Sequence, residues 1–145
     1  MAREGLLVVN LPISHQGSRI VGILSGIIGN ASKIDVADIQ EEFSKVLASN
    51  ERIEHAYQLI RDYFVFTDKR LVVVNIQGVT GSKKEFHSIP YKSVTHFSIE
   101  TGGTFDLDAE LKIWISSTAE PFSQKFNKRL SIFEVQAVLA SYVLK

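Results

Sequence analysis

The sequence predicts a mainly β domain with some helix: a sandwich or small barrel of seven short antiparallel strands, capped by a C-terminal helix and preceded by N-terminal helices. Alternating apolar and polar residues, interrupted by short turns, run from Ile53 to Phe126. Apolar residues recur at helical spacing before and after that region. The chain has 145 residues, 45% of them hydrophobic, and no cysteine. A single domain of this length can bury a core without disulfides.

The predicted strands differ in character along the chain. The unbroken run Val72–Val74 predicts a strand covered on both faces, whereas the strand that ends before Pro90 is polar. Trp114 alternates with Ile113 and Ile115, so it faces the other side of its strand, as either an exposed interface residue or a core residue. The expected strands span residues 53–60, 63–67, 71–76, 83–89, 94–100, 110–116 and 121–126.

Helical periodicity precedes the strands. Asp35 is the expected N-cap of an amphipathic helix whose apolar residues recur as far as Leu47, and Ser49-Asn50 is its expected stop. A shorter helix over residues 19–29 contains three glycines, so its stability depends on tertiary packing. These patterns divide the chain into an N-terminal helical extension, residues 1–50, and a second part, residues 51–145.

The C-terminal helix has the clearest local pattern. Ser131 and Glu134 have the spacing of a capping box, in which the first side chain accepts from the backbone N–H three residues on. Apolar residues follow at i, i+3, i+4, i+7 and i+8 as far as Val143. We expect this helix to plug one open end of the strand assembly.

Five stretches together carry a family resemblance: residues 53–57 (IEHAY), 61–71 (RDYFVFTDKRL), 77–81 (QGVTG), 88–93 (SIPYKS) and 105–115 (FDLDAELKIWI). With them, residues 50–145 resemble the bacterial pleckstrin-homology-like (PH-like) domains. The resemblance implies a seven-stranded barrel-like sandwich closed by the C-terminal helix, no known catalysis, no established ligand and a tendency to form ring-shaped oligomers. Eukaryotic relatives bind phosphoinositides through clustered bases, but the corresponding turn here, Arg61-Asp62-Tyr63, does not meet that pattern.

Composition and motifs exclude several function classes. Lys+Arg and Asp+Glu balance at 16 each, which argues against general nucleic-acid binding. The four histidines show neither metal spacing nor a neighbouring nucleophile, so we expect no catalytic residue, no cofactor and no metal. The residues 78–84 (GVTGSKK) lack the spacing of a phosphate loop and precede a predicted strand rather than a helix. A cytoplasmic location is expected, since no signal peptide or membrane-length apolar segment appears.

Charge is segregated along the sequence. Residues 61–92 hold six bases and three acids, whereas residues 100–120 hold five acids and one base. We predict a contact in which the basic surface of one subunit meets the acidic surface of the next and closes a homo-oligomeric ring. Charges that pair within one subunit are the alternative. The predicted interface residues are Lys69, Arg70, Lys83, Lys84, Asp106, Asp108 and Glu110.

Two further possibilities concern the same residues. Asp106, Asp108 and Glu110 are spaced to place three carboxylates on one side, where they could hold a hard cation, but they lack the glycine and distal glutamate of a calcium loop. We prefer the interpretation that these carboxylates form an acidic edge that binds basic residues of a partner. That partner is the next subunit or an unidentified protein. The second possibility is a monomer that docks on anionic membrane through Lys83, Lys84 and the apolar segment 20–28.

Overall fold

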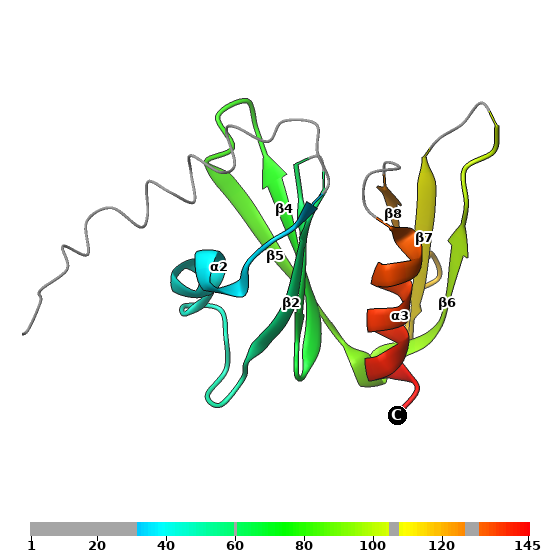
Figure 1. Ribbon diagram of the computed structural model, residues 1–145. Helices are drawn as coiled ribbons and strands as arrows, with labels where there is room; N and C mark the ends of the chain where they lie inside the picture. The colour runs from blue at the N-terminus through cyan, green and yellow to red at the C-terminus, as the bar shows by residue number, and fades with distance from the viewer. Residues whose placement is uncertain (1–31, 60, 105–107, 127–130) are drawn as a thin grey trace, which may run out of the picture.

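The computed structural model describes residues 32–59, 61–104, 108–126 and 131–145, which form two antiparallel sheets and two α-helices (Figure 1). The first sheet has the strand order β1 (Ser32–Lys33), β2 (Ile53–Gln58), β3 (Tyr63–Thr67), β4 (Arg70–Gln77) and β5 (Lys83–Pro90). The second sheet consists of β6 (Val94–Glu100), β7 (Ala109–Ile115) and β8 (Phe122–Phe126). The 3-10 helix η2 (Tyr91–Ser93) joins them, and the helices are α2 (Val36–Phe43) and α3 (Ile132–Val143).

The predicted fold class is confirmed. The seven expected strands correspond to β2–β8, with ends displaced by no more than two residues. The two-residue strand β1 was not predicted, because a pair of residues shows no alternation. The helix expected over residues 19–29 lies outside the described residues.

The principal core lies between the two sheets and α3. Phe64 of β3 makes edge-on and tilted contacts with Phe126 and Phe122 of β8, at ring-centroid distances of 5.5 and 5.9 Å. Val135 and Leu139 of α3 are fully buried in the same cluster. The helix therefore closes the corner of the sandwich between β2 and the second sheet, as expected for a C-terminal plug.

A second core lies on the opposite face of the first sheet, beneath α2 (Figure 1). Ile39 and Phe43 of α2 are buried there, and the Phe43 ring meets Phe86 of β5 edge-on at 5.7 Å. Because both faces of the sheet are covered, every residue of β3 is buried, and so is the Val72–Val74 run of β4. The expectation of a doubly covered strand is confirmed.

Both helices begin where the sequence predicts. Asp35 Oδ1 accepts a hydrogen bond from Ala37 N at 3.0 Å, and Ser131 Oγ accepts one from Glu134 N at 3.3 Å. The carboxylate of Glu134 accepts a hydrogen bond from Tyr57 Oη at 3.1 Å, which ties the first turn of α3 to β2. Of the two residues in the capping pattern, Ser131 thus caps the helix and Glu134 also makes a tertiary contact.

Helix α2 ends at Phe43, earlier than the expected stop at Ser49-Asn50. The backbone groups that would extend the helix have other partners. The N–H of Ala48 donates to Glu51 Oε2 at 2.8 Å, and the carbonyl of Val46 accepts from Arg70 Nη2 at 2.8 Å. One local contact, from Glu51, and one long-range contact, from Arg70, therefore take the place of the last helical turn.

Candidate functional site

The register of β4 and β5 separates the predicted basic residues into two groups. Arg70 faces Pro90 at one end of this ladder, and Gln77 faces Lys83 at the other. Eight extended residues span roughly 25 Å. Lys69 and Arg70 therefore lie at one end of the molecule and Lys83 and Lys84 at the other, so the bases do not form the single surface that the sequence suggested.

Arg70 belongs to a network within the chain. Its Nε and Nη2 atoms donate to the two carboxylate oxygens of Glu51 at 2.8 and 2.9 Å. Thr67 Oγ1 also donates to Glu51, whose side chain is only 1% exposed. The hydrogen bonds from Arg70 are the main cause that lowers the pKa of Glu51 from its ordinary value to about 2. Arg70 thus forms its ion pair within the chain. This favours, at this residue, the alternative in which charges pair within one subunit.

Lys84 is also paired within the chain. Its ammonium contacts the carboxylate of Glu42 on α2, and both side chains are partly buried. Lys69, Lys83 and Lys92 are exposed, and none of them forms an ion pair within the described part of the chain. These three bases remain available to a neighbouring molecule, whereas the Lys84 ammonium already has a carboxylate partner.

Acidic residues gather around a shallow groove at the ends of β6 and β7. The groove has a volume of about 250 Å³ and is lined by Glu100, Thr101, Gly102, Gly103, Asp108, Ala109, Glu110 and Lys125. Glu100 faces Glu110 in the β6–β7 ladder, and Glu110 faces Lys125 in the β7–β8 ladder. The predicted acidic edge thus has a definite place in the fold, although Asp106 lies outside the described residues.

Glu110 has partners inside its own sheet. Ser123 Oγ donates to Glu110 Oε1 at 2.5 Å, and Lys112 Nζ lies 3.1 Å from Glu110 Oε2. These hydrogen bonds, the one from Ser123 first, lower the pKa of Glu110. The carboxylate therefore stays ionised at the groove. Sequence reasoning did not single out Lys125, whose place beside Glu110 follows only from the strand register.

The outer face of the second sheet carries an aromatic pair. The rings of His96 and Trp114 stack at 4.3 Å with an interplanar angle of 16°. Trp114 is partly exposed and lies opposite His96 in the ladder, away from the core-facing Ile113. Of the two roles considered for Trp114, the structure supports the surface position.

Two glycines shape the tip of the β4–β5 hairpin. Gly78 and Gly81 have φ values of 79° and 66°, a left-handed conformation that glycine adopts at little cost. Arg61 Nη2 donates to the Gly78 carbonyl at 2.5 Å, and Val79 between the glycines is fully exposed. A strand follows, as predicted, so this loop lacks the helix that a phosphate loop requires.

The described residues offer no metal cluster and no membrane-spanning helix. In residues 32–59, 61–104, 108–126 and 131–145, no three His, Asp or Glu side chains are grouped as metal ligands would be. Within the same residues, neither helix has the length and apolar character needed to cross a bilayer. The apolar segment 20–28, the other part of the proposed membrane contact, lies outside the described residues.

Comparison with known proteins identifies the family. Residues 22–143 match the family model described as bacterial PH domain. The chain belongs to the bacterial PH (pleckstrin-homology) domain family. The match starts ahead of α2, so this PH domain includes the helix that covers the outer face of the first sheet.

Relatives support the same assignment. The chain is 52% identical over 122 residues to YjqA of Bacillus subtilis (strain 168), an uncharacterized protein; the match covers 83% of this chain and 98% of YjqA. A pleckstrin homology domain from Shewanella amazonensis SB2B shares 46% identity with a TM-score of 0.73, over 86% of this chain and all of that one. A DUF1696 family protein with such a domain, from Shewanella loihica PV-4, shares 43% identity with a TM-score of 0.71, over 79% and 98%. None of these names states an activity.

Proposed function

We propose that this bacterial PH domain is a non-enzymatic assembly module that acts in the cytoplasm as a ring of identical subunits. The observation that carries the proposal is the placement, at opposite ends of the molecule, of clustered acids and of bases that form no ion pair among the described residues. Lys69 and Lys92 lie at one end, and the groove lined by Glu100, Asp108 and Glu110 lies at the other.

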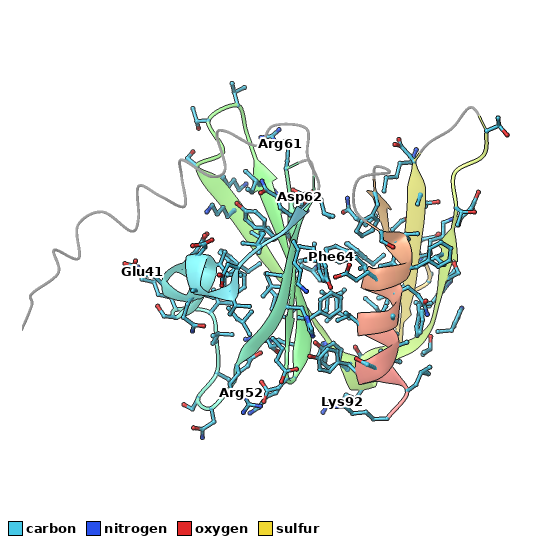
Figure 2. All side chains as sticks on the ribbon, viewed as in Figure 1. Glu41, Arg52, Arg61, Asp62, Phe64 and Lys92 are labelled. Atoms are coloured by element: carbon cyan, nitrogen blue, oxygen red, sulfur yellow. The ribbon has the colours of Figure 1, made fainter. Side chains whose placement is uncertain are left out.

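The two ends favour a head-to-tail contact. Figure 2 shows Lys92 at the lower end, near the start of β6, and the groove lies at the upper ends of β6 and β7. A contact between unlike ends is heterologous, and it closes into a ring when the rotation between neighbouring subunits is a whole fraction of a full turn. Lys83 lies at the same upper end as the groove, so a contact through Lys83 would join like ends instead.

The charges determine the relative orientation of two neighbouring subunits more than they determine the affinity between them. An exposed ion pair contributes about 0.2–1 kcal/mol, whereas like charges brought together cost several kcal/mol. The contact should therefore weaken with salt, because charges more than about 10 Å apart are screened at 0.1 M ionic strength. The remaining affinity comes from the apolar and polar surface buried around the charges.

A charge-exchange experiment tests this arrangement. The double variant Lys69→Glu/Lys92→Glu has two acidic ends, and Glu100→Lys/Asp108→Lys has two basic ends. Each alone should dissociate into monomers in native mass spectrometry, because like ends then meet. An equimolar mixture of the two should assemble into complexes that contain both variants, because each acidic end can then meet a basic end; in a closed ring with an even number of subunits the two variants are present in equal numbers.

Glu41→Lys is the matched control, since Glu41 is an exposed acid on α2, away from both ends (Figure 2). It should assemble like the unmodified chain. Full assembly of either double variant alone would refute the contact between the two ends. Failure of the mixture to assemble, with both variants folded, would refute it equally.

A further inference from the structure

The face of α3 that points away from the core is apolar. On the inner side, Ile132, Val135 and Leu139 are buried against the two sheets. On the outer side, Phe133 is 60% exposed and Leu144, at the C-cap, is 74% exposed. The described part of the chain exposes only three large hydrophobic side chains, and these are two of them. A helix that is apolar on all sides is normally covered on all sides.

The spacing of the outer residues places them in one line along the helix. Phe133, Ala137, Ala140 and Leu144 follow one another at intervals of four, three and four residues, and we call these four the α3 stripe. The stripe is about 16 Å long. Its large side chains lie at the two ends and its alanines at the centre, where a second helix can approach closely. From Phe133 to Leu144, Glu134 is the sole charged residue.

We propose that the α3 stripe binds the α3 stripe of a second copy of this chain, with the two helices antiparallel. A two-fold axis then passes between the midpoints of the two stripes. Phe133 of each copy lies opposite Leu144 of the other, and Ala137 lies opposite Ala140. Such a contact is isologous, because the same patch is used on both sides.

Charges at the ends of α3 favour the antiparallel direction. Glu134 and Lys145 are 11 residues apart, close to three helical turns, so they lie on the same flank of the stripe at opposite ends. The Glu134 side chain is 47% exposed, and Lys145 is exposed over the Tyr142 ring. In the antiparallel pair, Glu134 of each copy meets Lys145 of the other. A parallel pair would bring like charges together, which is unfavourable.

The contact is small and therefore weak. A fully buried aromatic side chain covers roughly 150–250 Å². Two copies of the stripe, with one Phe133 each, thus bury less than the roughly 1,200 Å² of a stable specific interface. We expect a dissociation constant of roughly 0.1–1 mM. Dimers should form in concentrated protein and be scarcely populated at low micromolar concentrations.

The dimer does not rest on the proposed ring. None of the described residues that line the acidic groove belongs to α3, and Lys69 and Lys92 also lie outside the helix. The helix runs along the molecule between the two ends that carry the ring contact (Figure 1). Because the dimer depends on apolar area, it should persist at salt concentrations that screen the ring contact.

Sedimentation equilibrium of the full chain in about 0.5 M salt, where the Debye length is only a few Å, tests the proposal. A monomer–dimer equilibrium should appear as the protein concentration approaches roughly 1 mM. Phe133→Gln/Leu144→Gln should weaken the dimer at least about tenfold, because both apolar anchors are lost. Both side chains are exposed in the monomer, so the variant should stay folded, which circular dichroism verifies.

Val79→Gln is the matched control, since Val79 is the third exposed large hydrophobic residue and lies at the β4–β5 hairpin tip. It should leave the dissociation constant unchanged. Lys69→Glu/Lys92→Glu should also leave it unchanged, so a failure of the ring would not remove the dimer. Equal association of Phe133→Gln/Leu144→Gln and the unmodified chain would overturn the proposal. A monomer at the highest concentration would assign the stripe to another occupant and overturn it too.

Cysteine cross-linking tests the direction of the two helices, because the chain has no cysteine of its own. Ala137→Cys and Ala140→Cys are oxidised separately and as an equimolar mixture. In the antiparallel pair, residues 137 and 140 face each other, whereas equal residue numbers are offset by about 4.5 Å along the axes. Disulfides between the two different variants should therefore form fastest. Faster disulfides within each variant, or rates no higher than those of the exposed control Glu85→Cys, would overturn the proposal.

Discussion

At the scale of single residues, the interaction of Glu51 with Arg70 joins the N-terminal part of the chain to the sheet. The carboxylate binds the guanidinium through two hydrogen bonds and also accepts from Ala48 N and Thr67 Oγ1. Removal of one partner of a buried pair leaves the other uncompensated. The interaction therefore fixes the segment between α2 and β2 against the β3–β4 turn.

We predict that Glu51→Gln lowers the free energy of unfolding by about 2–4 kcal/mol at pH 7. In the unmodified chain the folded-state pKa of Glu51, about 2, lies below its ordinary value of 4.5. The unfolded chain then binds more protons, so this contribution is present above pH 4.5 and is lost as the pH falls towards 2. In denaturant unfolding at pH 7, 4 and 3, the free energy of unfolding should fall less with decreasing pH in Glu51→Gln than in the unmodified chain.

Glu85→Gln is the control, since Glu85 is an exposed acid on β5. It should change stability by less than about 0.5 kcal/mol. Equal unfolding free energies for Glu51→Gln and the unmodified chain at pH 7 would contradict the structural role of the network.

The sequence shows which stretches are basic or acidic, but it does not show which charged residues pair in the folded chain. Arg70 and Lys84 were placed in an intersubunit contact because they contribute to a basic stretch. Glu51 precedes its partner Arg70 by 19 residues, and Glu42 precedes its partner Lys84 by 42 residues. Such contacts depend on how α2 lies over the sheet, and a local pattern does not contain that information.

At the scale of elements, α2 gives the first sheet a second covered face. Only two of its side chains, Ile39 and Phe43, are fully within the core, so the cover depends on few contacts. We predict that Phe43→Ala lowers the free energy of unfolding by about 3–5 kcal/mol, because it leaves a cavity next to Phe86. Thermal or denaturant unfolding measures the change.

Val79→Ala supplies the comparison, because Val79 is apolar but fully exposed at the hairpin tip. Its effect should stay below about 0.5 kcal/mol. If Phe43→Ala were as mild as Val79→Ala, α2 would not be an integral cover of the sheet.

Elements with a sustained pattern were predictable from the sequence. Alternation located β2–β8, and polar caps at Asp35 and Ser131 located both helix starts. The end of α2 was not predictable, because Glu51 and Arg70 bind the backbone that would have continued it. Strand β1 is too short to show a pattern.

At the scale of the whole molecule, the register of the sheets decides which charges act together. The predicted basic stretch is divided between the two ends of β4, and the acids gather at the ends of β6 and β7. Asp108 and Glu110 of the predicted acidic edge line one groove, because they are close along the chain. The predicted basic residues do not lie together, because strand direction carries them to two ends.

Native mass spectrometry of the purified chain at several ionic strengths tests the central claim most directly. We predict one discrete oligomer at low salt, which dissociates progressively as salt screens the contact between the basic and acidic ends. A monomer at every ionic strength, at protein concentrations well above the micromolar range, would contradict the account.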